Sequence, residues 1–114
     1  MIEIIVLKNG TEIMGFEVSG HAESEDYGRD IVCASVSVLA QTAVNALGEL
    51  TGVDFDYEIA EGYLRCEVPK TLPFNEKQRV AAILKTIYVG YRGVAESYPD
   101  YVSICVRRCD DYDD

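Results

Sequence analysis

The periodicity of apolar residues changes along this chain in a fixed order, which constrains the fold more than any other feature. Over five short segments, apolar residues alternate with polar ones or form β-branched runs, which is typical of strands. Between the second and third segments, and again between the fourth and fifth, apolar residues recur at helical spacing. The strands are expected at residues 2–7, 12–19, 54–59, 63–68 and 101–107, and the helices from 31 or 33 to 50 and from 75 to 94.

Each expected helix carries a single apolar stripe and therefore has one face to bury. The first stripe is Val36, Leu39, Ala40, Ala43, Leu47 and Leu50, and the second is Val80, Ile83, Leu84, Ile87, Tyr91 and Val94. The pattern predicts an α+β fold of order ββαββαβ, in which both helices pack on a mostly antiparallel sheet of about five strands. A chain of 114 residues is long enough for a single domain, expected to span 1–114, and too short for two. The order of the strands in the sheet does not follow from the pattern.

Local signals refine the boundaries. The dipeptide Asn9-Gly10 predicts a tight hairpin turn, because both of its residues tolerate positive φ. Gly52 is a plausible end for the first helix. Asn75 is expected to cap the second helix, with Gln78 completing a capping-box pair. The acidic tail, residues 110–114, is expected to be solvated.

Composition excludes several classes of function. The chain has 10 basic and 20 acidic residues, a net charge of −10, which argues against a nucleic-acid binder and favours basic partners. No apolar run reaches the roughly 18 residues that a membrane span needs, and no signal peptide opens the chain, so a cytoplasmic location is expected. The four cysteines should then be reduced thiols. Cys66 and Cys105 fall on expected strands and are interpreted as core residues, and without a Cys-x-x-Cys motif we expect no metal and no cofactor.

The residues that can carry chemistry gather around one polar segment, residues 20–32, expected to be a long surface loop. The single histidine, His21, begins this loop, and Cys33 follows at the expected start of the first helix. The free amides and positive dipole end of a helix N-terminus favour a thiolate and can bind an oxyanion. A neighbouring imidazole would complete a cysteine–histidine pair.

Each of these residues also has a simpler interpretation. A small cysteine near a helix start is more often a packing residue, and a lone histidine after a strand is more often a surface group. Asp30 either caps the helix or orients His21, and the sequence leaves both roles open. Ser37 lies one turn after Cys33 and either bonds the thiolate or a substrate or faces solvent. Tyr27 is the loop aromatic best placed to touch a ligand.

Two short motifs favour the catalytic interpretation of these residues over the simpler one. Gly20-His21-Ala22 is followed, after a short spacer, by Gly28-Arg29-Asp30-Ile31-Val32-Cys33-Ala34-Ser35-Val36-Ser37. Together they resemble the signature of the ribosomal-processing cysteine protease family, called Prp, and the resemblance in length and element order covers the whole chain. Two small departures are Ser35, where alanine is common, and the acidic residues of the loop; neither removes a catalytic group.

The resemblance implies a specific activity. Family members remove a short N-terminal extension from the twenty-seventh large-subunit ribosomal protein, cutting after a pair of aromatic residues, which implies an apolar pocket beside the nucleophile. The family's nucleophile falls on Cys33 and its histidine on His21. Supporting roles fall on Asp30, Ser37 and Gly20, and the substrate-covering loop on Ala22, Glu23, Tyr27 and Gly28. The family is typically a homodimer.

Two other classes of function compete with a protease. A non-catalytic acidic module could escort a basic ribosomal protein, and it would need the negative surface but not Cys33. A redox-sensing thiol protein would need a resolving partner for Cys33, and the nearest cysteine in sequence is Cys66. A serine at position 33 separates these classes, because a binder survives that change and a protease does not.

Overall fold

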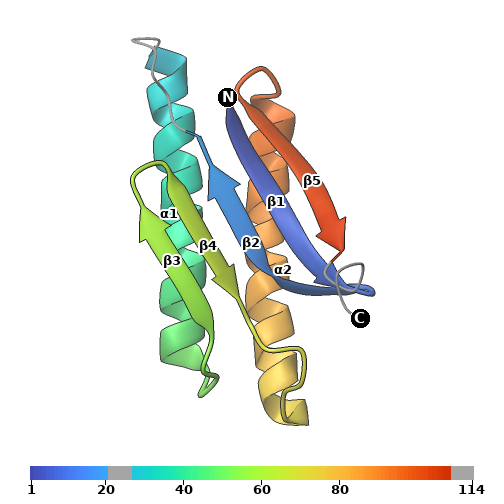
Figure 1. The fold of residues 1–114 in the computed structure, drawn as a ribbon. Helices are drawn as coiled ribbons and strands as arrows, with labels where there is room; N and C mark the ends of the chain where they lie inside the picture. The colour runs from blue at the N-terminus through green and yellow to red at the C-terminus, as the bar shows by residue number, and fades with distance from the viewer. Residues whose placement is uncertain (21–26, 109–114) are drawn as a thin grey trace.

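The computed structural model describes residues 1–20 and 27–108, and within the first turn of α1 it describes the backbone of 27–30 but not the side chains. The expected order ββαββαβ is confirmed (Figure 1). The elements are β1 (Ile2–Asn9), β2 (Glu12–Ser19), α1 (Tyr27–Leu50), β3 (Asp56–Ala60), β4 (Tyr63–Glu67), α2 (Phe74–Ser97) and β5 (Val102–Arg108). The expected solvated tail, 110–114, lies outside the described residues.

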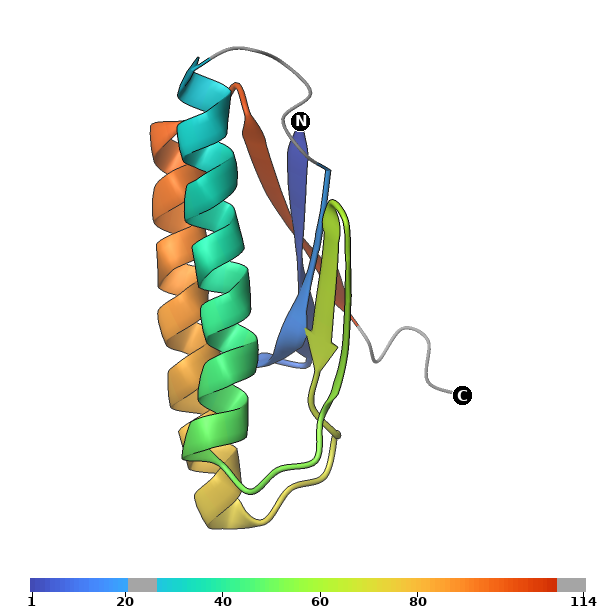
Figure 2. The same cartoon turned by 90° about the vertical axis from the view of Figure 1, so that its left-hand side faces the viewer.

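The five strands form one sheet in the order β3-β4-β2-β1-β5. Neighbouring strands are antiparallel except β1 and β5, which run parallel with Ile4 opposite Ile104. The last strand reaches the far side of β1 by way of α2, and a parallel neighbour requires such a crossover. Both helices cover the same face of the sheet (Figure 2). The mostly antiparallel α+β architecture is therefore confirmed, with one parallel pair.

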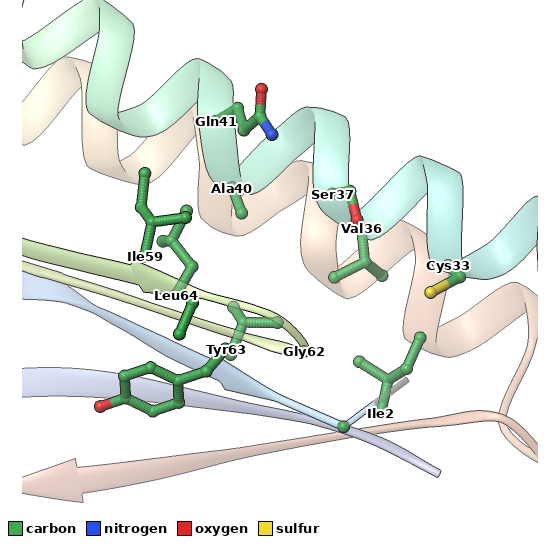
Figure 3. Close-up of a pocket in the computed structure, with 13 residues that line it drawn as sticks. Ile2, Cys33, Val36, Ser37, Ala40, Gln41, Ile59, Gly62, Tyr63 and Leu64 are labelled. Carbon is green, nitrogen blue, oxygen red and sulfur yellow. The ribbon is translucent and has the colours of Figure 1, made fainter. Parts of the chain in front are cut away.

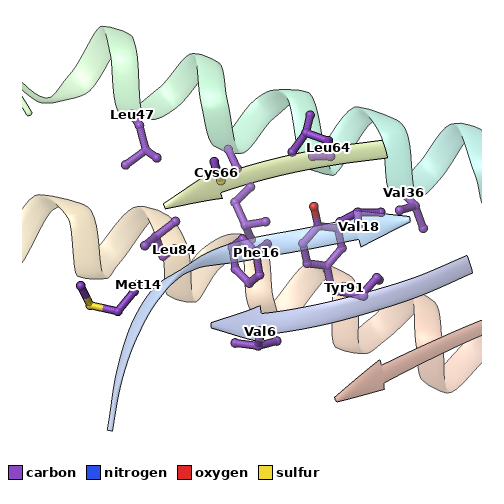
Figure 4. Close-up of a cluster of buried hydrophobic side chains, with 14 of the residues drawn as sticks. Val6, Met14, Phe16, Val18, Val36, Leu47, Leu64, Cys66, Leu84 and Tyr91 are labelled. Atoms are coloured by element: carbon purple, nitrogen blue, oxygen red, sulfur yellow. The ribbon is translucent and has the colours of Figure 1, made fainter. Parts of the chain in front are cut away.

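The core lies between this sheet face and the two helices (Figure 4). Strand alternation sends every second residue of the central strands toward the helices, as Ile4 and Val6 of β1 and Phe16 of β2 illustrate, and all three are fully buried. The helices contribute their predicted stripes, and the Tyr91 ring meets the Phe16 ring edge-on at 5.0 Å. The expected stripe of the first helix extends one residue too far, because Leu50 is exposed.

The predicted starts of both helices and the predicted cap of the second helix are wrong. The first helix begins at Tyr27 rather than at 31 or 33, so part of the expected loop is helical. The second helix begins at Phe74 with Pro73 as its N-cap, and no side chain caps it, so Asn75 and Gln78 form no capping box. The carbonyl of Pro73 already accepts the first helical hydrogen bond, from the amide of Lys77 at 2.8 Å. Asn75 is therefore inside the helix, where its side chain cannot act as an N-cap.

Cys105 is also misassigned by the sequence. It lies on the edge strand β5 and is exposed, whereas Cys66 lies on a central strand and is fully buried, as expected. The two cysteines differ in the face of the sheet that they occupy. Cys66 points toward the helices, but the Cys105 side chain alternates to the opposite face, which neither α1 nor α2 covers (Figure 2).

The stretch Ile31–Leu50 of α1 is long and apolar enough to cross a membrane by length and composition, with a mean hydropathy of 1.6. The expectation that no segment meets this test is therefore wrong. Residues 31–48 include no charged residue and several small ones such as alanine and serine. The mean hydropathy is therefore high even though large apolar side chains do not form a continuous run. In the structure this helix packs its apolar stripe on the sheet and on α2, and 28% of the apolar window is buried.

Candidate active site

A cavity of about 160 Å³ opens between α1 and the end of the sheet where β1 begins and β2 ends (Figure 3). Its helix side is formed by successive turns of α1, including Cys33, Ser37 and Gln41. Its sheet side is apolar and comes from the four strands β1 to β4 and the β3–β4 turn. The sheet residues that line it are Ile2, Val18, Gly20, Ile59, Ala60, Gly62, Tyr63 and Leu64.

Cys33 is half-buried, and its thiol points into the cavity from α1 (Figure 3). The sequence argument placed it in the first helical turn, and the structure corrects this. Because α1 begins at Tyr27, Cys33 is the seventh residue of the helix. Only the first four amides of a helix lack an intrahelical partner, so the amide of Cys33 is not a free oxyanion donor. The dipole effect also decays within the first turn, which weakens the predicted activation of the thiol by the helix end.

Ser37 follows Cys33 on the same side of α1, as the four-residue spacing predicts, and both line the cavity. Gln41, one further turn along, extends the polar edge. Ser37 is exposed at the cavity edge. Polar groups therefore follow one line along the helix while the opposing wall is apolar. Such a cavity can bind an apolar side chain on one side and a polar backbone on the other.

Gly20 directly follows β2 and lines this cavity. Its φ is +96°, and a Cβ atom placed there would lie 2.4 Å from the carbonyl oxygen of Met1. Only glycine accepts both the left-handed backbone and the close approach. Its amide donates a 3.0 Å hydrogen bond to the carbonyl oxygen of Gly62 in the β3–β4 turn. The point where the chain leaves the sheet toward position 21 is thereby fixed.

The other predicted site residues divide into two groups. Three of them, His21, Ala22 and Glu23, lie outside the described residues. The backbone of Tyr27, Gly28 and Asp30 forms the start of α1, while their side chains are not described. The structure thus brings Cys33, Ser37 and Gly20 to one cavity, and the proposed contact of His21 with Cys33 stays a prediction.

Sequence reasoning missed the wall contributed by the β3–β4 hairpin. Ile59 is 55% exposed on the edge strand β3, and Leu64 on β4 stands opposite it in the ladder. Their alternation was visible in the sequence, but their place in the wall of the Cys33 cavity depends on the strand order, which was not.

Tyr63 lines the cavity at the same turn, and its ring extends away from it (Figure 3). Its hydroxyl donates a 2.8 Å hydrogen bond to Glu17, and Glu17 also pairs with Arg107 at 3.2 Å. Burial, followed by this hydrogen bond, raises the pKa of Tyr63. The hydroxyl therefore remains neutral and ties β4 to β2 rather than acting as a base.

No three His, Cys, Asp or Glu side chains gather to hold a metal ion among the described residues. What the described cavity offers is a thiol, a hydroxyl and an apolar wall. This arrangement suits a peptide that places an apolar side chain beside a nucleophilic sulfur.

Comparison with known proteins identifies the class. The family model described as Cysteine protease Prp matches residues 1–103. The ribosomal processing cysteine protease Prp of Bacillus subtilis (strain 168) is 31% identical over 94 residues, covering 81% of this chain and 84% of that protein.

Two crystal structures of the Staphylococcus aureus ribosomal processing protease share the fold. One, in complex with a substrate peptide, has a TM-score of 0.80 at 24% identity, and the other, with a covalently linked product peptide, has 0.78 at 25%. Each covers 94% of this chain and 100% of the other.

The fold, the cavity thiol and these matches define a cysteine protease. More specifically, the chain belongs to the Prp family of ribosomal processing cysteine proteases.

Proposed function

We propose that this protein removes the N-terminal extension of the twenty-seventh large-subunit ribosomal protein, with Cys33 as nucleophile and His21 as its acid–base partner. The observation that carries the proposal is the placement of the Cys33 thiol in an apolar-walled cavity. One crystal structure of the S. aureus relative contains a covalently linked product peptide, and a covalent product is what a nucleophilic cysteine forms.

The chemistry proceeds in two steps. In the first, His21 takes the thiol proton, and the Cys33 sulfur attacks the carbonyl carbon of the scissile peptide. The carbon–nitrogen bond breaks, and the imidazolium returns the proton to the leaving amine. In the second, His21 takes a proton from water, the hydroxide attacks the thioester, and the sulfur leaves with that proton restored. In this mechanism Ser37, one helical turn from Cys33, hydrogen-bonds the substrate backbone, and we assign Asp30 the role of orienting His21.

The described surface fits a substrate with aromatic residues before the cut. Ile59, Ala60 and Leu64 form an apolar wall of the cavity that also holds the Cys33 thiol, and in this proposal an aromatic ring rests on that wall while the following carbonyl lies near the sulfur. The net charge of −10 favours encounter with a basic ribosomal protein.

The decisive experiment uses a peptide that spans the N-terminal extension of this ribosomal protein from the same genome. Wild type and Cys33→Ser are incubated with it, and the products are read by mass spectrometry. We expect one cut, after an aromatic pair, by wild type only. Cys105→Ser is the matched control, because Cys105 is exposed on β5 outside the cavity, and it should cleave like wild type.

His21→Ala tests the acid–base partner separately. We expect kcat to fall by about 100-fold or more, the range that general acid–base catalysis supplies. Unchanged kinetics would leave the thiol without a histidine partner. Equal binding of the peptide by wild type and Cys33→Ser, with no cut by either, would favour the non-catalytic escort instead.

We also propose a homodimer and a cytoplasmic location, where ribosomal proteins are made and assembled. The support for a dimer is the outer side of α1, which carries no charged residue between 31 and 48 and exposes Val38 at 65%. Light scattering on wild type should give twice the monomer mass of 12.7 kDa, and Val38→Glu should give the monomer mass. A wild-type monomer at micromolar concentration would contradict the dimer.

A further inference from the structure

A second cavity, of about 260 Å³, lies at the opposite end of the strands from Cys33. It opens between the start of β2, the segment that follows β4, and the first half of α2. Its floor is apolar and includes Met14, Val68 and Val80, all nearly fully buried. The protease chemistry proposed above uses none of these residues.

The rim of this cavity is basic in a strongly acidic protein. Lys70, Lys77 and Lys85 line it, and they are three of the four lysines in the chain. The one acidic residue in the lining is Glu12, whose carboxylate pairs with Lys77 at 2.9 Å. The cavity therefore combines an apolar floor with a net positive rim, and this combination selects an acidic segment that carries an apolar or aromatic side chain.

The strand β5 ends near the β1–β2 turn (Figure 1). Its last residue, Arg108, donates a 2.7 Å hydrogen bond to the carbonyl oxygen of Gly10, and the residue after that glycine, Thr11, lines the cavity. On the helix side of the sheet, Lys8 stands opposite Arg108 in the ladder and lies 6.0 Å from the centre of the Tyr88 ring. Tyr88 is one helical turn from Lys85, so the surface between β5 and the cavity is also basic.

The chain that follows Arg108 has the chemistry that this cavity selects. Residues 110–114 are Asp-Asp-Tyr-Asp-Asp, with four carboxylates, one aromatic ring and no basic group. Six extended residues from Arg108 reach about 20 Å. Because the segment is tethered next to the cavity, its local concentration there is in the millimolar range, so even weak contacts hold it.

We propose that residues 110–114 dock into this lysine-rimmed cavity of their own chain, with the Tyr112 ring on the apolar floor and the aspartates beside the lysines. Docking fills the space above this floor and pairs acidic residues with lysines in a chain of net charge −10. The proposal does not depend on the function of Cys33, because the two cavities share no residue.

The test exploits the absence of tryptophan from this chain. Tyr112→Trp introduces a single reporter, and acrylamide quenching of its fluorescence measures how far water reaches it. At low salt we expect quenching about twofold weaker than in the free peptide of residues 109–114 with the same replacement. Near 0.5 M salt the difference should largely disappear, because screening weakens exposed ion pairs.

Lysine variants locate the docked segment. Lys85→Gln in the Tyr112→Trp background should raise quenching toward the value of the free peptide. Arg79→Gln is the matched control, since it removes one positive charge from an exposed position on the same helix but outside the lining, and it should change nothing.

Three results would overturn the proposal. The first is quenching equal to that of the free peptide at low salt. The second is protection that Lys85→Gln leaves unchanged, since the segment would then lie elsewhere. The third is protection that disappears on dilution, since the segment would then occupy the cavity of a second copy.

Discussion

The amide of Gly20 donates a 3.0 Å hydrogen bond to the carbonyl oxygen of Gly62, and this bond joins the end of β2 to the β3–β4 turn in the lining of the Cys33 cavity. Both glycines have positive φ, +96° and +69°. The bond fixes the position from which the chain departs toward His21. The glycine of the first short motif is therefore a geometric requirement of the site.

Gly20→Ala should destabilise the protein and reduce cleavage. The left-handed backbone costs about 1 to 2 kcal/mol for a non-glycine residue, and the Cβ atom would also meet the carbonyl oxygen of Met1. Gly10→Ala is the matched control, because Gly10 has φ +63° with nothing within 4 Å of its Cβ position. Urea unfolding should show a larger loss for Gly20→Ala, and only that variant should lose peptide cleavage. Equal losses in stability would show that the contact with Met1 costs nothing.

Ile59→Ala should weaken substrate binding with little effect on stability. Ile59 is 55% exposed, but it forms part of the apolar wall of the Cys33 cavity. Losing these methyl groups from a binding pocket should raise KM by about 10-fold, while kcat changes little. The control is Val89→Ala, which removes a similarly exposed apolar side chain, at 56%, from α2 outside the cavity. Matching KM values for the two variants would remove this wall from the substrate site.

The sequence predicted the element order, the mostly antiparallel sheet and the central core, because these depend on periodicity within one segment. Phe16 and Tyr91, for example, lie in strongly periodic stretches, and both are fully buried. The sequence also brought Cys33 and Ser37 together, because their spacing is one helical turn. These inferences needed no knowledge of how distant segments meet.

The remaining features depend on contacts between distant segments. The presence of Ile59 in the wall of the Cys33 cavity follows from strand order, and the exposure of Cys105 follows from which face the helices cover. The early start of α1 at Tyr27 was hidden because Gly28 has low helix propensity and the first turn has no apolar period. Because α1 starts one to two turns earlier than expected, Cys33 lies beyond the first turn, where the helix end activates its thiol less.

Cys66 should resist thiol reagents until the protein unfolds, whereas Cys105 should react at once. Burial raises the pKa of the Cys66 thiol, which removes the reactive thiolate, and Cys105 is exposed. Iodoacetamide labelling followed by peptide mass spectrometry measures each cysteine in the same sample. Labelling of Cys66 in the native protein at the rate of Cys105 would show that β4 opens readily.

Tyr91→Phe should stabilise the protein. Among the described residues, the Tyr91 hydroxyl is the one buried side-chain oxygen or nitrogen without a hydrogen-bond partner (Figure 4). An unpaired buried hydroxyl costs about 1 to 3 kcal/mol, and phenylalanine keeps the ring contact with Phe16. We expect a gain of about 1 kcal/mol in the free energy of unfolding at pH 7. Tyr57→Phe is the control, and it should leave the free energy of unfolding unchanged because Tyr57 is 58% exposed.

Tyr91→Phe should also reduce the loss of unfolding free energy at alkaline pH. Burial, with a smaller contribution from Cys66, raises the pKa of Tyr91, while an unfolded tyrosine ionises near pH 10. Above about pH 10 the unfolded state therefore releases a proton that the folded state retains, and stability falls as pH rises. Denaturant titrations between pH 7 and 11 should show the advantage of Tyr91→Phe over wild type growing above pH 10. A constant or shrinking advantage would mean that the Tyr91 hydroxyl reaches solvent in the folded protein.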